Sequence, residues 1–429
     1  MADNTRKELR NKMVYQVFVR NHSKEGTFKA VEEDVPRIRA LGTDIVYLMP
    51  IHPIGKSRRK GALGSPYAIS DYRTVNPEFG TLEDFKNLVR AIHENGMKCI
   101  MDVVYNHTSP DSVLSKEHPE WFYKKPDGTF GNRVGDWTDI IDLSYDNQDL
   151  WDYQIETLKM WADIVDGFRC DVAPLIPIKF WDRARAEIAE ISPDFIWIAE
   201  SIEPEFLLQL RSMNLAAHSD CEVFHAFDAS YDYDIYPDLI AYLRGESTLA
   251  DYVNAIRRQE YIYPDNYVKL RFLENHDQMR AHHSIPDERA LRNHTAFLFF
   301  QKGLAFVYAG QEFGVDHQPG LFDKDTIDLL PHDGVDMSGL ISILSSIKKE
   351  PVFADSVYRV RDAGNDICVA SHTNSGSRAI GIFSLKGQKA NVRVDLPDGS
   401  YTNKIDNGTV EVSHGSISCT GEPIIMILK

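Results

Sequence analysis

Three acidic residues each follow or close an apolar, strand-like run: Asp171 follows GFRC, Glu200 follows FIWIA, and Asp277 closes LRFLENHD. In a barrel of parallel strands the carboxyl ends of the strands face the active site, so acids that follow several strands converge there. Converging carboxylates can act as nucleophile, general acid and general base. A single acid in this position is as easily a helix cap or a salt-bridge partner, but three of them favour catalysis.

The spacing of the first two acids predicts that they lie on neighbouring strands. Asp171 and Glu200 are 29 positions apart (200 − 171), close to the roughly 30 residues of one strand-helix-strand unit. Neighbouring strands lie about 4.8 Å apart. That distance suits the roughly 5 to 5.5 Å between the two carboxyl groups of enzymes that break a sugar linkage with retention of configuration. The spacing therefore favours a retaining mechanism.

Arg169 stands two residues before Asp171, so both side chains point to the same face of a strand. We expect this guanidinium to favour the ionised form of Asp171, as a nucleophile requires. We also expect the surrounding negative charge to keep Glu200 protonated, so that it can donate a proton. His107 and His276 follow other strand ends and lie in the same region of the predicted barrel, although each could also be a hydrogen-bonded residue of the core.

The composition is that of a folded protein and excludes several classes of partner. With 429 residues, of which 43% are hydrophobic and 26% charged, the chain suits a barrel of about 250 to 400 residues plus a small extra domain. A net charge of −17 argues against nucleic acid. The start, MADNTRKELRNKMVYQ, has no signal-peptide-like apolar segment, and no run approaches a membrane helix, so we expect a cytoplasmic protein without a membrane partner. Five scattered cysteines predict free thiols in a reducing compartment.

Short β-rich runs alternate with longer amphipathic segments, which is typical of a parallel sheet whose strands are joined by helices. We therefore predict an α/β fold with a (β/α)8 TIM barrel. One helix is predicted at LEDFKNLVRAIHE, because Thr81 can cap its start and Gly96 follows its end. The eight predicted strands span residues 13–19, 44–49, 98–104, 167–170, 195–199, 222–224, 268–272 and 304–308.

Two segments depart from this alternation. Asp102 and Asp171 are 69 positions apart (171 − 102), about twice a βαβ repeat, and HPEWFYKKPDGTFGN between them is rich in Pro, Gly and aromatic residues. Near the C-terminus, runs such as ICVASHT and RAIGIFSL alternate as short strands do. We predict three parts: a catalytic barrel of residues 1–107 and 138–350, a short loop domain inserted after the third strand at 108–137, and a C-terminal antiparallel β-sandwich at 351–429.

Four motifs, in this order, resemble the signatures of the alpha-amylase family of glycoside hydrolases, and the match extends over most of the chain. They are DVVYNH at 102–107, GFRCD at 167–171, WIAE at 197–200 and ENHD at 274–277. The resemblance implies that Asp171 is the nucleophile, Glu200 the general acid and base, and Asp277 the third carboxylate, which stabilises the transition state. It also implies a substrate-binding set of Tyr67, from SPYAISDY, with Asp102, His107, Arg169 and His276.

The family's calcium site is where this chain departs from the pattern. Secreted members carry a Lys-His pair shortly after the nucleophile, whose histidine carbonyl helps to bind calcium, whereas this chain reads DVAPLIP. Asn106 and Asp142 are candidate ligands of a structural calcium ion. Calcium takes six to eight oxygens, however, and a hydrogen bond between these two side chains is an equally good interpretation. No cofactor is expected to be required for the chemistry.

The expected activity is hydrolysis of α-1,4-glucosidic bonds in maltodextrins and other starch-derived oligosaccharides, by double displacement through a covalent glycosyl-enzyme intermediate. An α-glucosidase or a 4-α-glucanotransferase would use the same acids, and both stay open as alternatives within the family. An alternative of another class is a catalytically inactive sugar-binding protein on the same barrel, which the complete set of three acids disfavours.

Overall fold

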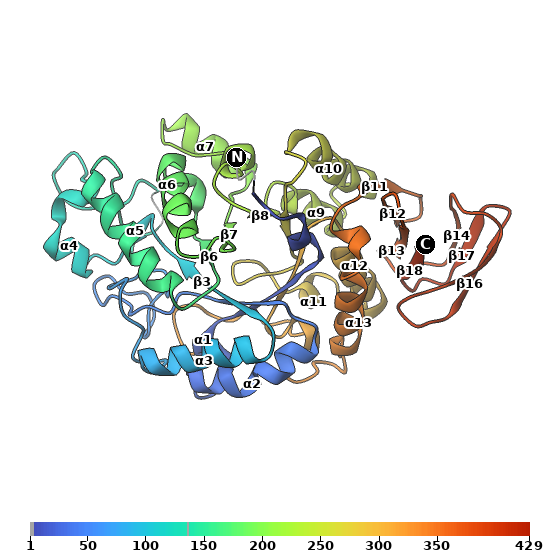
Figure 1. Cartoon of the computed structure of the whole chain (residues 1–429), viewed down its shortest axis with the longest axis horizontal. Helices are drawn as coiled ribbons and strands as arrows, with labels where there is room; N and C mark the ends of the chain where they lie inside the picture. The colour runs from blue at the N-terminus through green and yellow to red at the C-terminus, as the bar shows by residue number, and fades with distance from the viewer. Residues whose placement is uncertain (1–3, 135–136) are drawn as a thin grey trace.

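Eight parallel strands close into a barrel in the larger part of the molecule (Figure 1). The computed structural model describes residues 4–134 and 137–429. Around the barrel the strands follow the order β1, β10, β9, β8, β7, β6, β3, β2, and β2 pairs with β1 to close it. The predicted (β/α)8 barrel is confirmed. Its strands are β1 (Met13–Val17), β2 (Ile45–Leu48), β3 (Lys98–Val103), β6 (Gly167–Cys170), β7 (Ile196–Ala199), β8 (Ala229–Tyr231), β9 (Lys269–Arg271) and β10 (Leu304–Tyr308).

The predicted strand at 222–224 is wrong, because this segment lies at the end of the short helix α8 (Asp220–Val223). A capping box starts that helix, and within it Glu222 accepts a hydrogen bond from the backbone N–H of Ser219 at 2.7 Å. Such reciprocal capping satisfies backbone donors that would otherwise be free to join a sheet. The barrel strand is instead β8, whose three residues are all buried.

Helices cover the outside of the barrel and return the chain from one strand to the next (Figure 1). The predicted helix is confirmed as α3 (Leu82–Glu94), and Thr81 caps its start by accepting from the backbone N–H of Asp84. Its buried face includes Phe85 and Leu88. The other long helices are α2 (Phe28–Ala40), α5 (Gln148–Ala162), α6 (Ile178–Ala189), α7 (Pro204–Ser212), α9 (Tyr236–Leu243), α10 (Leu249–Ile262), α12 (Glu288–Phe300) and α13 (Ser338–Lys348). Short helices are α1 (Val19–His22), α4 (Val113–Glu117) and α11 (Ala281–Ser284).

Between β3 and α5 the chain leaves the barrel and forms an inserted segment. The short strands β4 (His107–Thr108) and β5 (Ile141–Asp142) pair antiparallel within it. Trp121 of this segment is buried and stacks on His118. Gly135 and Asp136, near the end of the predicted loop domain, lie outside the described residues, so the boundary at 137 stays a prediction.

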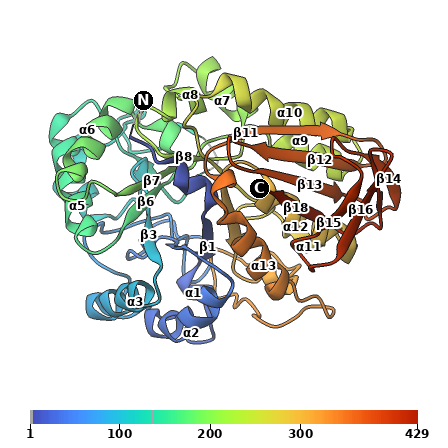
Figure 2. The ribbon, with the colours of Figure 1, turned by 45° about the vertical axis from the view of Figure 1, so that its right-hand side comes forward.

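Two four-stranded antiparallel sheets form the C-terminal part and confirm the predicted β-sandwich (Figure 2). The sheet β11, β12, β13, β18 contacts α10 and α12 of the barrel, and the second sheet has the order β14, β17, β16, β15. Apolar side chains of both sheets, such as Ile382 and Ile417, share one core. The strands are β11 (Val357–Asp362), β12 (Ile367–Thr373), β13 (Arg378–Ser384), β14 (Ala390–Arg393), β15 (Gly399–Thr402), β16 (Thr409–Ser413), β17 (Ser416–Cys419) and β18 (Ile424–Leu428).

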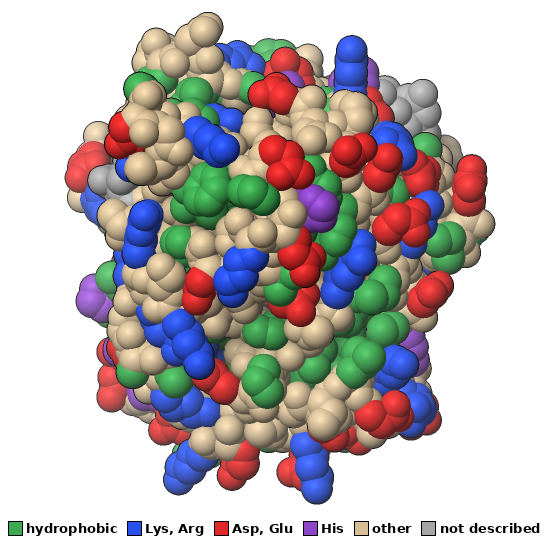
Figure 3. Space-filling view, turned by 90° about the vertical axis from the view of Figure 1, so that its left-hand side faces the viewer, with side chains coloured by type: hydrophobic (Ala, Val, Ile, Leu, Met, Phe, Trp, Pro, Cys, Tyr) green, Lys and Arg blue, Asp and Glu red, His purple; other side chains and the backbone are tan. Residues whose placement is uncertain are grey.

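The surface charges are mixed. On the face shown in Figure 3, Lys and Arg side chains lie among Asp and Glu side chains and gather into no large basic patch. Within the described part of the chain, no helix combines the length and the apolar character needed to cross a bilayer. All five cysteines are free thiols, and four of them are buried.

Candidate active site

Asp171 and Glu200 lie next to each other at the carboxyl ends of two neighbouring strands. Cys170 of β6 pairs with Ala199 of β7, and the two acids are the residues that follow directly. The backbone N–H of Glu200 donates to the carbonyl of Cys170 at 3.0 Å, which continues the ladder to this point. Because neighbouring strands lie about 4.8 Å apart, the two carboxyl groups reach the same small volume.

Arg169 joins the acids into one charged cluster. Its Nη1 lies 2.8 Å from Asp102 Oδ1 and 3.1 Å from Asp171 Oδ1. Its Nη2 lies 2.5 Å from Glu200 Oε1. All four side chains are nearly inaccessible, with exposures between 0% and 9%. The cluster therefore places three carboxyl groups around a single buried guanidinium.

Burial raises the pKa of Asp171 well above its ordinary value, and the negative charge of Glu200 raises it further, whereas Arg169 lowers it. Arg169 therefore favours the ionised form of Asp171, as expected, but burial and Glu200 outweigh it, and the net pKa shift is upward. The physical reason is that one guanidinium is shared among three carboxyl groups and does not offset the loss of hydration. The cluster consequently holds a proton to higher pH than an isolated carboxyl group would.

Removal of the guanidinium is expected to destabilise the fold. In Arg169→Met the buried carboxyl groups lose their counter-charge, and breaking a buried ion pair in this way costs about 3 to 5 kcal/mol of unfolding free energy. The folded-state pKa values of Asp102 and Asp171, which burial already raises, then lie still further above their unfolded values. Stability of this kind is present at low pH and is lost as the pH rises, so the deficit should be larger at pH 8 than at pH 5.

Urea unfolding of Arg169→Met and wild type at the two pH values measures this effect. The matched control is Arg183→Met on α6, because Arg183 is 40% exposed and pairs with Asp152 and Glu187 at the surface. That change should cost no more than about 1 kcal/mol. A deficit for Arg169→Met that is equally small, or that shrinks toward high pH, would contradict the account of the cluster.

Tyr67 and His276 form the second part of the site. The Gln16 amide donates to His276 Nδ1 at 2.9 Å, so the neutral ring carries its proton on Nε2. This Nε2 lies 2.5 Å from the Tyr67 oxygen and 3.2 Å from Asp277 Oδ2. Tyr67 in turn donates to Asp102 Oδ2 at 3.1 Å. The Tyr67 and His276 rings stack with centroids 5.5 Å apart, so the network fixes both of them.

Burial lowers the pKa of both predicted substrate-binding histidines, His107 and His276, to about 4. Both imidazoles are therefore neutral between pH 5 and pH 8. A neutral imidazole offers one donor and one acceptor, which suits the hydroxyl groups of a sugar. His107 also lies beside Trp137, with ring centroids 5.8 Å apart.

The strand ends open into a cleft of about 290 Å³. Asp277 is the most exposed of the three acids, with 41% of its side chain accessible. Arg169 and Asp102 do not line the cleft; they are buried beneath it and hold the residues that do. The predicted site residues that line it are Tyr67, His107, Asp171, Glu200, His276 and Asp277.

Val172 positions Glu200 through its backbone. The Val172 N–H donates to Glu200 Oε2 at 2.8 Å. To do so, Val172 adopts φ 35° and ψ 43°, in the left-handed region. A β-branched residue in that region carries strain of about 1 to 3 kcal/mol, which persists only where the surroundings impose it. The strained turn after Asp171 thus holds the second acid in place.

Lys60, Asp139 and Phe322 also line the cleft, although no sequence motif nominated them. They lie on loops after three different strands. The length of those loops was the one feature of the sequence that could have indicated these residues.

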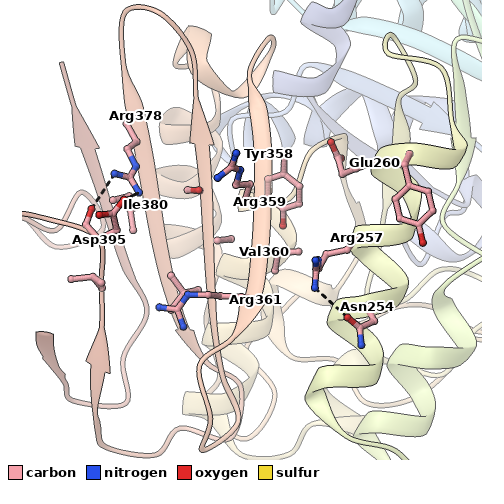
Figure 4. A pocket seen from close by; sticks show the side chains of 15 residues that line it. Asn254, Arg257, Glu260, Tyr358, Arg359, Val360, Arg361, Arg378, Ile380 and Asp395 are labelled. Atoms are coloured by element: carbon pink, nitrogen blue, oxygen red, sulfur yellow. Dashed lines mark hydrogen bonds and ion pairs between the residues drawn. The ribbon is translucent and has the colours of Figure 1, made fainter. Parts of the chain in front are cut away.

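A larger groove of about 820 Å³ lies away from the strand ends and is lined by α10, by strands β11, β12 and β13 of the sandwich and by residues 394–395 (Figure 4). Two carboxyl groups line it, and each is paired with a cation: Asp395 lies 3.3 Å from Arg378, and Glu260 lies 3.1 Å from Lys302. Since its described lining residues include no pair of facing acids, this groove does not offer the chemistry of the smaller cleft.

One candidate calcium ligand, Asn106, directly precedes β4, and the other, Asp142, belongs to β5, which pairs with β4; a calcium site there stays a prediction. Asp142 Oδ2 accepts from the backbone N–H of Arg133 at 2.7 Å, and the Arg133 guanidinium lies 3.5 Å away and supplies positive charge. Asp142 Oδ1 is buried without a hydrogen-bond partner, and the Asn106 amide contacts His107 Nδ1 at 3.2 Å. Calcium takes six to eight oxygens. In the described part of the chain, no three His, Cys, Asp or Glu side chains are grouped as metal ligands.

The closed barrel, the C-terminal sandwich and the acids around one small cleft define a glycoside-active barrel enzyme. The family model described as "Alpha amylase, catalytic domain" matches residues 14–352, and the model of the bacterial alpha-amylase C-terminal domain matches residues 359–426. The chain belongs to the alpha-amylase family.

Relatives of known structure cover nearly the whole chain. An alpha-amylase from Lactobacillus plantarum is 46% identical with a TM-score of 0.96, over 99% of this chain and 100% of that one. A maltogenic alpha-amylase from Thermotoga neapolitana is 31% identical with a TM-score of 0.87, over 98% and 99% of the two chains.

Curated relatives are longer than this chain. The alpha-amylase MalA of Haloarcula japonica is 26% identical over 95% of this chain and 61% of its own length. An alpha-1,4-glucan:maltose-1-phosphate maltosyltransferase of Rhodospirillum rubrum is 31% identical over 61% of this chain and 38% of its own length. The chain thus spans about three fifths or less of these two proteins.

Proposed function

We propose that the protein hydrolyses α-1,4-glucosidic bonds of maltodextrins with retention of configuration. The observation that carries this proposal is the position of Asp171 and Glu200 on neighbouring strands, where both line one cleft and both contact Arg169. Retaining enzymes need carboxyl groups about 5 to 5.5 Å apart, whereas inverting enzymes need about 6.5 to 9.5 Å to admit a water molecule. The spacing of neighbouring strands supports the first arrangement.

In the first step Asp171 attacks the anomeric carbon while Glu200 gives its proton to the glycosidic oxygen. The bond to the leaving sugar breaks, and a glycosyl ester forms on Asp171. In the second step Glu200, now a carboxylate, takes a proton from water, whose oxygen attacks the anomeric carbon and releases Asp171. Asp277 accepts hydrogen bonds from sugar hydroxyl groups, and its charge stabilises the positive sugar ring of the transition state.

The remaining groups bind and orient the sugar. Tyr67 presents an aromatic ring to the apolar face of a pyranose. His107 and His276 donate and accept hydrogen bonds as neutral rings, so they add no positive charge beside the oxocarbenium-like transition state. Neither step needs a metal ion, because the two carboxyl groups supply the nucleophile and the proton. The five free thiols support the expected reducing compartment.

Glycosyl transfer is the second candidate, because maltosyltransferases are among the relatives. Hydrolysis and transfer share Asp171 and Glu200 and differ in whether water or a sugar hydroxyl attacks the intermediate. With maltoheptaose we expect one new reducing end for each bond broken, and NMR should detect the α-anomer of that end first. If products longer than maltoheptaose form without new reducing ends, the enzyme is a transferase and not a hydrolase. The absence of any cleavage would contradict both.

A further inference from the structure

Two loops on one side of the cleft bind to each other. One loop, 54–64, follows β2, and the other, 318–325, follows β10. The backbone N–H groups of Leu63 and Gly64 both donate to the carbonyl of Phe322 at 3.0 Å. Segments more than 250 positions apart in the chain are therefore joined by main-chain hydrogen bonds beside the site.

Arg20 and a glycine fix this contact. Arg20, which is 2% exposed, donates to the carbonyls of Gly64 at 2.9 Å and Leu321 at 3.0 Å, so one buried guanidinium binds both loops. Gly61 has φ 63°, and a Cβ at this position would lie 2.7 Å from the Phe322 Cβ. Only glycine allows this conformation together with this close approach. The two loops consequently form one continuous wall.

Lys60 connects this wall to the inserted segment. Its Nζ lies 3.0 Å from Asp139 Oδ1, and it also lies 5.7 Å from the centre of the Phe322 ring. The Asp139 side chain is only 7% exposed, and that of Lys60 is 35% exposed. All three residues line the cleft. The wall therefore runs without a break from the loop after β10, through the loop after β2, to the insert after β3.

The two loops of the wall lie across the barrel from Glu200, whereas the insert that carries Asp139 follows β3, two strands from β7. Around the barrel β1 is the strand opposite β7, and β2 and β10 flank β1. On the β7 side, Glu200 is the only described residue of the loops after β7 and β8 that lines the cleft. Glu200 must face the glycosidic oxygen and the leaving sugar, so the reducing-end part of a substrate extends over β7. The non-reducing part then points toward the wall.

We propose that the cleft is closed on its non-reducing side by Lys60, Asp139 and Phe322. The enzyme then cuts from the non-reducing end of the chain and releases a short product of fixed length. This inference rests on the proposed function and deepens it. A volume of about 290 Å³ is at the small end of the roughly 300 to 1,000 Å³ of small-molecule sites, which suits a short saccharide. The Lys60 ammonium and the Asp139 carboxylate can bind hydroxyl groups of the terminal sugar, and Phe322 excludes a further one.

Two p-nitrophenyl maltoheptaosides test this proposal, one with a free non-reducing end and one whose terminal glucose carries a 4,6-O-ethylidene group, with the shortened nitrophenyl products separated and quantified by chromatography. Wild type should cleave the free substrate roughly 100-fold faster than the blocked one, because a closed pocket rejects added bulk. The double variant Lys60→Ala/Phe322→Ala should narrow this ratio by about tenfold or more. Asp139→Asn, which keeps the side-chain size and breaks the ion pair, should lower the ratio of the two rates by less than the double variant does. Lys56→Ala, an exposed lysine of the same loop, should leave it unchanged.

Each outcome separates this inference from the proposed function. Equal rates of wild type on both substrates would overturn the closed end and leave hydrolysis intact. Cleavage of neither substrate would overturn the proposed function, and this inference with it. If Asp139→Asn and the double variant fold with wild-type melting temperatures and keep the wild-type ratio, the wall is not formed by these residues.

Discussion

Replacement of Asp171 by Asn is expected to lower kcat/KM on maltodextrin by about ten thousand-fold or more, equivalent to about 5.4 kcal/mol of transition-state stabilisation. Asn has nearly the same size as Asp but cannot form a glycosyl ester that turns over. The loss should come without destabilisation. Burial and the charge of Glu200 raise the pKa of Asp171. Ionisation of this carboxyl group therefore lowers the free energy of unfolding at neutral pH. The melting temperature of Asp171→Asn should therefore equal or exceed that of wild type.

The matched control for this change is Asp182→Asn. Asp182 is an exposed carboxylate on α6, in the helix that joins the strands of the two acids, and its removal should leave kcat/KM within about twofold of wild type. Near-normal turnover by Asp171→Asn would refute the nucleophile assignment. A loss of activity that accompanies a large fall in melting temperature would instead point to a structural role for Asp171.

For Glu200→Gln, we expect a loss of roughly a thousand-fold in kcat/KM on maltodextrin, within the range of general acid catalysis. Gln keeps an oxygen that can accept from the Val172 N–H, so the side chain should stay in place. A substrate with a dinitrophenyl leaving group needs little protonation, and its glycosylation step should fall by no more than about tenfold. Added azide should then speed turnover, because an anion can attack the intermediate without a general base.

Stopped-flow release of dinitrophenol measures the glycosylation step directly. Glu205→Gln is the control, because Glu205 is an exposed acid in the first turn of α7, a few residues further along the chain. It should behave as wild type on both substrates. An equal loss on maltodextrin and on the activated substrate would show that Glu200 does not donate the proton.

Much of this molecule was predictable because parallel barrel strands repeat one simple pattern. Each of the runs GFRC and IWIA is a buried strand followed directly by an acid. That pattern located Asp171 and Glu200 and predicted that they are neighbours. The alternation of strands and helices predicted the barrel, and the change to short strands near the C-terminus predicted the sandwich.

The errors have identifiable physical causes. Strand β8 has three residues, Ala229–Tyr231, and is too short to form a clear apolar run, while the apolar end of α8 nearby resembled a strand. The net direction of the pKa shift of Asp171 depends on burial and on how many acids share Arg169, which spacing along the chain does not reveal. Contacts such as Lys60 with Asp139 join loops, where no periodic pattern fixes which residues meet.

The central claim is that Asp171 forms a covalent bond to the sugar, and trapping that bond tests it most directly. A 5-fluoroglucosyl fluoride should glycosylate the enzyme quickly and hydrolyse slowly, because fluorine beside the ring oxygen destabilises the positive transition state of each step. Peptide mass spectrometry of the inactivated protein should then locate one sugar ester on Asp171. A sugar attached to Glu200 or Asp277, or turnover of the reagent to an inverted product without any attachment, would contradict the account.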